Sequence, residues 1–263
     1  MKSTNSFVAT PENKEGVFSP GGPTPTFNPP PSADSAGGQE TGGSTTEYHL
    51  NHLAIRITDP ARSLHFYVDL LGMRVIFTFN AGPFTIYYLG HPPPGIQPAD
   101  LASWAQETSQ IPVLTRTKGL LELYHVHGTE QVSNGNVPPH LGFAHLGFSV
   151  PDVRDAVSRL KEAGVTIVKD VGEFEREHVP LSTWEEDRGV GQGGIHENYA
   201  AFLHKFAIVA DPVSEASMRV STSLFPPFPS EDGVGSVLLQ VRGKSLTQRQ
   251  DGYWLELIPQ TME

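Results

Sequence analysis

The sequence contains two copies of one pattern, the first beginning at His52 and the second at His145. The first copy reads HLAIRITDPARSLHFYVDLLGMRVI and the second reads HLGFSVPDVRDAVSRLKEAGVTIV. Each opens with His-Leu and then alternates apolar and polar residues, which is typical of a strand with one buried face. The repeat predicts that the chain is built from two copies of one small folding unit.

A helix is expected after the first strand of each copy. Asp59 and Asp152 each lie seven residues after their histidine, where an aspartate side chain can accept hydrogen bonds from the free N–H groups of a helix start. Pro60 falls in the first turn, where proline is tolerated. Gly72 and Gly164 stand where glycine commonly ends a helix, and the apolar segments RVIFTF and VTIV predict a second strand in each copy.

A later strand in each copy carries one tripeptide, Leu121-Glu122-Leu123 in the first and Leu255-Glu256-Leu257 in the second. The two copies therefore share a β-α-β-β-β plan. The predicted fold class is α+β, with two βαβββ units that each curl a mainly antiparallel sheet. We place unit one at residues 48–130 and unit two at residues 141–260, within a domain of residues 47–263.

The two copies differ in length, since Gly72 and Glu122 lie 50 positions apart whereas Gly164 and Glu256 lie 92 positions apart. The segments FAIVADP and DGYWLELI would form a short hairpin if joined directly, which marks residues 213–250 as an insertion in the last hairpin. Codons available for its ends resemble splice signals, so a retained intron is one hypothesis and a long surface loop is the other. A tenfold longer loop adds only about 2 kcal/mol of closure entropy, so the domain can fold with it.

Composition narrows the expected partners. Residues 1–46 are rich in Pro, Gly, Ser and Thr, and we expect a disordered tail because such a segment buries too little apolar surface. We expect no membrane partner and a cytoplasmic location, since there is no apolar run of the ~20 residues that a membrane span needs and no secretory signal at the start. The net charge of −11 argues against a nucleic-acid partner.

Four residues form the expected metal site. Each copy supplies one histidine at the start of its first strand, His52 or His145, and one glutamate in its last strand, Glu122 or Glu256. Taken singly, each is more often a packed or solvated residue, so the prediction rests on the repeat. Pseudo-twofold packing of the units would bring two imidazoles and two carboxylates to one divalent ion and leave positions open for a substrate. With no cysteine in the chain, these are the ligand types available.

Residues 48–212 and 251–260 resemble glyoxalase I (lactoylglutathione lyase) of the vicinal oxygen chelate superfamily. The motifs that carry the resemblance are NHLAIRITDPARSLHFYVDLLGM, GLLELYHVHGTE, NGN, GFAHLGFSVPDV and DGYWLELIP. The resemblance implies methylglyoxal detoxification: the hemithioacetal of methylglyoxal and glutathione is converted to S-lactoylglutathione by a proton shuttle through a metal-bound enediolate. It also implies a homodimer with sites at the subunit interface, and one zinc or nickel ion per site held by His52, Glu122, His145 and Glu256.

The resemblance also assigns roles. Glu256 is the predicted catalytic base, and Glu122 could share that role from the opposite side. Arg56 matches a family position that binds a glutathione carboxylate, and an exposed salt-bridging arginine is the alternative reading. Two departures leave the identity of the thiol open: a glutathione-contacting Asn of the family falls on Val126, and an Arg falls on His140 or Leu141.

Other functions of the same fold remain open at the level of sequence. They are an acyl-CoA epimerase, an extradiol dioxygenase and an inactive isoform whose insertion displaces the Glu256 strand. An extradiol dioxygenase gathers its ligands within one unit, which the distribution of two ligands per unit disfavours. The long connection GEFEREHVPLSTWEEDRGVGQGGIHENY is read either as a solvated loop or as a lid that brings His178, Trp184 or His196 near a substrate.

Overall fold

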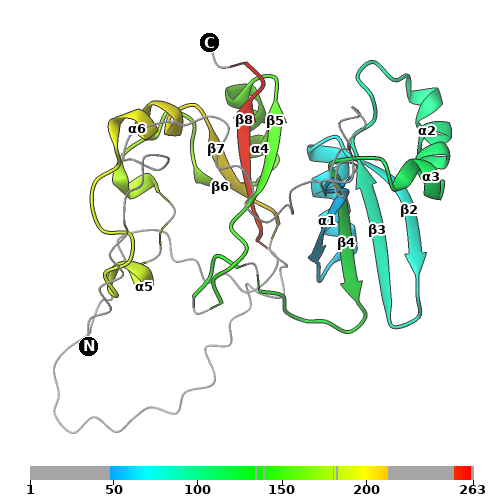
Figure 1. The fold of residues 1–263 in the computed structure, drawn as a ribbon, viewed down its shortest axis with the longest axis horizontal. Coiled ribbons are helices and arrows are strands. Elements are labelled where there is room, and N and C mark those ends of the chain that lie inside the picture. The colour runs from blue at the N-terminus through cyan, green and yellow to red at the C-terminus, as the bar shows by residue number, and fades with distance from the viewer. Residues whose placement is uncertain are drawn as a thin grey trace, which may run out of the picture.

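The protein is described by a computed structural model that covers residues 48–133, 135–138, 140–179, 181, 183–212 and 252–261. It contains two four-stranded mixed sheets, sheet A from the first copy and sheet B from the second (Figure 1). The predicted α+β class and the two βαβββ units are confirmed. The tail predicted for residues 1–46 and the insertion predicted at residues 213–250 lie outside the described residues.

Sheet A has the strand order β1-β4-β3-β2, in which β1 and β4 run parallel and the other neighbours run antiparallel. Its strands are β1 (His52–Arg56), β2 (Arg74–Asn80), β3 (Phe84–Gly90) and β4 (Leu120–Val126). The first helix, α1 (Pro60–Leu64), continues as a π-helical segment (His65–Leu70). A 3-10 turn (Pro98–Asp100), α2 (Leu101–Thr108) and α3 (Ile111–Leu114) connect β3 to β4.

Sheet B repeats this arrangement with the order β5-β8-β7-β6 and a parallel β5–β8 pair. Its strands are β5 (Leu146–Val150), β6 (Thr166–Lys169), β7 (Ala207–Ala210) and β8 (Trp254–Pro259), and α4 (Val153–Glu162) follows β5. The connection from β6 to β7 contains a 3-10 turn (Arg176–His178), α5 (Thr183–Glu186) and α6 (Glu197–Leu203). Among the described residues, the longest connection therefore precedes β4 in the first unit but precedes β7 in the second.

The helix ends follow the signals in the sequence. The side chain of Asp59 accepts a hydrogen bond from the backbone N–H of Arg62, and that of Asp152 accepts one from Asp155. These bonds satisfy N–H groups that the first turn of a helix leaves free. After each helix the chain turns at a glycine with positive φ, 78° at Gly72 and 79° at Gly164, a conformation that is unstrained only for glycine.

One hydrophobic core joins the two units. It contains the inward faces of both sheets together with residues of the π-helical segment and of α4, including Phe66, Leu123, Leu160 and Leu257, all fully buried. Polar contacts also cross from one unit to the other: the Tyr67 hydroxyl donates to the carboxylate of Asp211 at 3.1 Å, and the Arg159 guanidinium donates to the carbonyl of Leu70. The units of a single chain are therefore packed back to back through this core.

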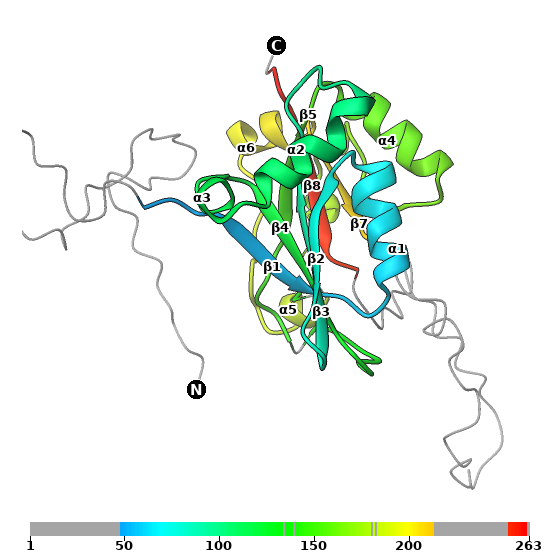
Figure 2. The same cartoon turned by 90° about the vertical axis from the view of Figure 1, so that its right-hand side faces the viewer.

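The long connections lie on the outer sides of the two sheets. In Figure 1, α2 and α3 flank sheet A on the side away from sheet B, and α5 and α6 flank sheet B on the opposite side. Figure 2 shows α2 and α3 in front of the strands of sheet A. Leu114 and Trp104 pack there on Leu120 and Tyr88. None of the described helices is long and apolar enough to cross a bilayer.

Candidate metal centre

The first His–Glu pair lies on the outer face of sheet A. In the parallel register of β1 and β4, His52 is opposite Leu120 and Ala54 is opposite Glu122, so the two side chains share one face and lie diagonally across the pair. The Nε2 atom of His52 is 3.6 Å from a carboxylate oxygen of Glu122. The Nδ1 atom of His52 lies 2.8 Å from the amide oxygen of Asn51. An amide oxygen can only accept, so this bond places the imidazole proton on Nδ1 and leaves the Nε2 lone pair available to a metal.

Asn51 itself is fixed by the connection before β4. Its amide nitrogen donates to the carbonyl oxygens of Leu114 and Thr117, at 2.8 and 2.6 Å. The end of α3 thus orients the amide that orients the ring of His52. Histidines that bind a metal commonly make such a hydrogen bond through their other ring nitrogen, because it sets the tautomer and the orientation of the ring.

The second pair repeats this geometry on sheet B. His145 immediately precedes β5, and Gly147 of β5 is opposite Glu256 of β8. The Nε2 atom of His145 lies 3.4 Å from a carboxylate oxygen of Glu256. Two ligands held about 2.1 Å from one ion, at a coordination angle of 90–110°, lie roughly 3.0–3.4 Å apart. Each pair is therefore close to the spacing of two ligands on one divalent cation.

The two pairs face away from each other within one chain. Leu121 and Leu123 flank Glu122 and belong to the shared core, as do Leu255 and Leu257, which flank Glu256. Because side chains alternate along a strand, both glutamates project from the outer faces of the back-to-back sheets. Among the described residues, no three His, Asp or Glu side chains are close enough to hold one ion. The four predicted ligands thus lie in two separate His–Glu pairs, named half-sites for the predicted metal centre, and the joining of both pairs at one ion stays a prediction that needs a second chain.

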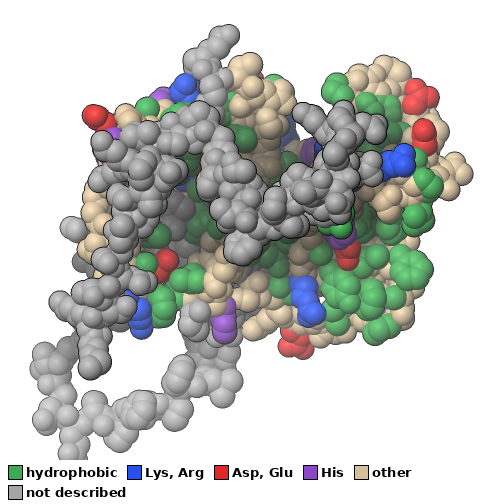
Figure 3. All heavy atoms as spheres, viewed as in Figure 1, with side chains coloured by type: hydrophobic (Ala, Val, Ile, Leu, Met, Phe, Trp, Pro, Cys, Tyr) green, Lys and Arg blue, Asp and Glu red, His purple; other side chains and the backbone are tan. Residues whose placement is uncertain are grey.

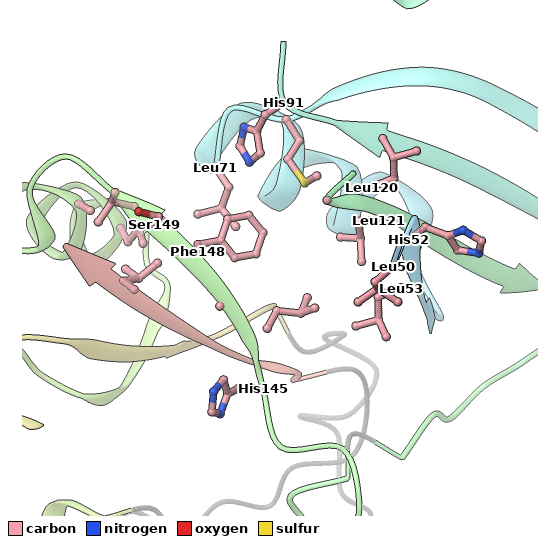
Figure 4. A pocket seen from close by; sticks show the side chains of 18 of the residues that line it. Leu50, His52, Leu53, Leu71, His91, Leu120, Leu121, His145, Phe148 and Ser149 are labelled. Atoms are coloured by element: carbon pink, nitrogen blue, oxygen red, sulfur yellow. The ribbon is translucent and has the colours of Figure 1, made fainter. Parts of the chain in front are cut away.

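A cavity of about 550 Å³ lies between the units, and His52 and His145 are among its lining residues. Its lining is mainly apolar, including Leu53, Phe148 and Leu160, and neither glutamate lines it. Figure 4 shows His52 and His145 on two sides of this cavity with their rings turned away from it.

An aromatic residue that sequence reasoning missed adjoins the first half-site. Tyr88 of β3 is opposite Glu122 in the sheet, and its ring lies 5.2 Å from that of His52 and stacks on Phe77. Burial, and then the negative charge of Glu122, raise the pKa of Tyr88 to about 12, so its phenol stays protonated. The sequence alone does not show that β3 pairs with β4, and the register of this pairing is what places Tyr88 beside Glu122.

Arg56 lies on the same face of β1 as His52, as the strand alternation predicts. Its guanidinium lies 5.6 Å from the ring centre of Tyr124, and it forms no ion pair with a described residue. Hydrophobic side chains also gather on this face, and Figure 3 shows them over β2 and β3. Phe79, two residues after Phe77, is 57% exposed there. Beyond the part that α2 and α3 cover, the outer face of sheet A is therefore apolar and exposed, with Arg56 on its edge strand β1.

A buried lysine, two strands away from Glu256 in sheet B, was also missed. Lys169 of β6 is opposite Ile208 of β7, which is opposite Glu256 of β8. Its ammonium donates to the carbonyl oxygens of Asp170 and Phe206, at 2.9 and 2.6 Å. Burial lowers the pKa of Lys169 to about 8, against the opposing effect of nearby carboxylates that include Glu256. From the sequence alone, Lys169 would be expected to lie in solvent at the end of a strand.

The three residues proposed from the connection between β6 and β7 have local roles. His178 completes a capping box with Glu175, Trp184 stacks under the guanidinium of Arg188, and His196 caps the start of α6. A further residue of this connection, Tyr199 of α6, lies near enough to Glu256 for the carboxylate charge to raise its pKa, after the larger effect of burial. The position of α6 over sheet B could not be read from the sequence.

Comparison with known proteins gives consistent matches. The family described as the Glyoxalase/Bleomycin resistance protein/Dioxygenase superfamily matches residues 49–179, a range that includes three of the four predicted ligands but not Glu256. The chain is 38% identical over 131 residues to lactoylglutathione lyase of Pseudomonas aeruginosa, covering 48% of this chain and 70% of that protein. It is 33% identical over 143 residues to lactoylglutathione lyase of Pseudomonas putida, covering 52% and 79%.

Other matches are partial or remote. Glyoxalase I of Saccharomyces cerevisiae is 32% identical over 140 residues, which are 51% of this chain but only 40% of the yeast protein. Among solved structures, the trypanothione-dependent glyoxalase I of Leishmania major aligns with a TM-score of 0.39 and 18% identity, over 81% of this chain and 86% of that one. Glyoxalase I of Zea mays aligns with a TM-score of 0.40 and 16% identity, over 80% and 44%.

Proposed function

Since the chain belongs to the glyoxalase/bleomycin resistance protein/dioxygenase superfamily, we propose that it is a divalent-metal-dependent lactoylglutathione lyase. Its substrate in this proposal is the hemithioacetal of methylglyoxal and glutathione, and its product is S-lactoylglutathione. Both Pseudomonas relatives are named lactoylglutathione lyase, and the match to each covers more than two thirds of its length. The observation that carries the proposal is the pair of His–Glu half-sites at ligand spacing on opposite outer faces.

Two chains related by a twofold axis would complete these half-sites. If sheet A of one chain faces sheet B of its partner, His52 and Glu122 stand opposite the partner's His145 and the partner's Glu256. The same operation generates a second, identical site, as a closed symmetric dimer requires. The exposed apolar face of sheet A supports such an interface, because an apolar patch around a polar centre is typical of a contact surface. The homodimer is therefore part of the proposal.

The donor set fits a divalent cation. Two imidazoles and two carboxylates suit zinc or nickel, and four protein ligands leave room for substrate oxygens on a six-coordinate ion. When bound, the ion would act as a Lewis acid on the two oxygens of the hemithioacetal. It would favour removal of the proton from the carbon that lies between the sulfur and the carbonyl group.

The protein supplies the proton transfer. The carboxylate of Glu256 takes the proton from the carbon that carries sulfur and returns it to the neighbouring carbon, so one C–H bond breaks and another forms without an external oxidant. Glu122 is placed to assist from the opposite side. Glu256 has the more exposed side chain of the two, 22% against 15%, and so is the better placed for contact with substrate. Arg56 is available to bind a substrate carboxylate on the face of the first half-site.

The first experiment measures metal content and turnover of the full chain. We expect one divalent ion per chain and formation of a thioester from methylglyoxal plus glutathione. His145→Ala should lose most of the metal and the activity, because one imidazole ligand is missing. His65→Ala is the matched control, since His65 also pairs with a carboxylate, Asp69 at 2.8 Å, but lies on the helix after β1. Metal-bound protein without turnover would refute the proposed reaction.

The second experiment asks whether each site is shared between chains. One variant carries His52→Ala and Glu122→Gln, and the other carries His145→Ala and Glu256→Gln, so neither homodimer has an intact site. Equal mixing with subunit exchange should restore about a quarter of the wild-type activity, because half of the dimers are mixed and each mixed dimer has one intact site. No recovery despite demonstrated exchange would refute a site shared between two chains.

A further inference from the structure

The connection between β6 and β7 is the largest difference between the two units. β2 and β3 are separated by residues 81–83 only, whereas the corresponding strands β6 and β7 are separated by residues 170–206. This connection carries α6 onto the outer face of sheet B, on the same side as Glu256 (Figure 1). Residues that have no counterpart in the first unit therefore lie above the second half-site, the one that contains Glu256.

The placement of α6 is fixed by packing. Leu203, at its end, is 2% exposed and belongs to a cluster with Phe206, Ile208 and Trp254. Ile208 is opposite Glu256 in the sheet, and Trp254 precedes Glu256 by two residues, so this cluster lies on the face of the glutamate. A helix places residues four positions apart on one side. Tyr199 therefore shares the side of α6 that Leu203 turns toward that face.

The hydroxyl of Tyr199 is available as a donor. The residue is 52% exposed, and its hydroxyl makes no hydrogen bond to another residue that the structure describes. A tyrosine hydroxyl is protonated near neutral pH and can donate one hydrogen bond.

We propose that Tyr199 is a specificity-determining residue that donates a hydrogen bond to a carbonyl or carboxylate oxygen on the thiol half of the substrate. The inference rests on the proposed function. The reacting carbons must reach Glu256 on the sheet itself, whereas Tyr199 stands on a helix above the sheet. The part of the substrate that meets it is therefore the part that extends away from the reacting carbons, which in a peptide thiol is rich in carbonyl and carboxylate oxygens.

The test replaces Tyr199 by phenylalanine, which removes the hydroxyl and keeps the ring. We expect the KM for the methylglyoxal–glutathione hemithioacetal to rise about fivefold to tenfold with kcat within twofold, the effect of one hydrogen bond made equally in ground and transition states. The Kd of the unreactive thioether S-methylglutathione, measured by calorimetry, should rise by the same factor. Phe202→Leu is the matched control, because Phe202 is 46% exposed on the same helix but has no hydroxyl.

The outcomes separate this inference from the proposed function. An inactive wild-type protein refutes the proposed function itself. An active wild type with unchanged KM and Kd in Tyr199→Phe refutes the inference alone. Equal changes in Phe202→Leu would also overturn it, since they would trace the effect to the helix surface. A fall in kcat at constant KM would overturn it as well, because the hydroxyl would then act on the chemical step.

Discussion

Deleting residues 213–250 tests how the last hairpin is built. The backbone N–H of Asp211 donates to the carbonyl of Tyr253 at 3.0 Å, and the carboxylate of Asp211 accepts from the N–H of Tyr253 at 2.8 Å. The two strands are thus already paired where the insertion begins and ends. Joining Pro212 to Asp251 leaves the loop Pro-Asp-Gly between Asp211 and Tyr253. Gly252 has φ 57°, which suits the last position of a three-residue hairpin loop, and proline suits the first turn position.

The expected effect follows from loop closure. The loop shortens from residues 212–252, which are 41 residues, to three. Closure entropy grows as (3/2)RT ln n, so the deletion should raise the free energy of unfolding by about 2 kcal/mol. For a domain of this size that corresponds to a rise of about 4–8 °C in Tm. The deletion leaves every hydrogen bond of Asp211 described above in place.

Urea denaturation followed by circular dichroism measures this effect in three proteins. They are the full chain, the deletion variant, and a control in which residues 213–250 are replaced by a Gly-Ser segment of equal length. Loop length alone predicts that the control matches the full chain and that the deletion exceeds both. A deletion variant that is no more stable than the full chain would refute the reasoning, as would a control that falls well below it.

Two further perturbations probe the core and the buried lysine. Leu160→Ala removes a fully buried side chain from the core shared by the units and should lower the free energy of unfolding by about 2–5 kcal/mol, whereas Val190→Ala, at a 48% exposed position, should change it by less than about 0.5 kcal/mol in urea titrations. The pKa of Lys169 is lowered to about 8 in the folded state, so above that pH the unfolded chain binds more protons and stability should rise with pH until the ordinary lysine pKa near 10.5. Unfolding measured at several pH values from about 8 to about 10 should show a smaller rise in Lys169→Met than in the wild type, and identical slopes would contradict the assignment.

Local structure was readable from the sequence because it depends on short-range rules. Asp59 and Gly72 mark the ends of the first helical segment, as helix capping requires, and the alternation in Leu121-Glu122-Leu123 puts the leucines in the core and the glutamate on the other face. The same rules hold in the second copy. The pairing of a histidine with a glutamate in each unit followed from the repeat.

The positions of the long connections could not be predicted, because the two units happen to be similar in total length once residues 213–250 are removed. Removing residues 213–250 makes the two units similar in length, which suggested similar internal spacing. The structure instead has α2 and α3 before β4 in the first unit and α5 and α6 before β7 in the second. The number of residues between two motifs does not show which pair of strands the extra residues connect, so the position of Tyr199 in the fold could not be derived.

The sequence by itself determined two βαβββ units and the face of each sheet that carries a histidine and a glutamate, because strand periodicity and helix caps are properties of neighbouring residues. Only the tertiary structure decided which faces of the two sheets are buried together. Both faces of each sheet carry apolar side chains, such as Leu123 and Tyr88 on sheet A, so hydrophobicity along one strand does not choose between them. The choice depends on the total apolar area that the faces and helices bury together, and it leaves the two half-sites pointing outward from one chain.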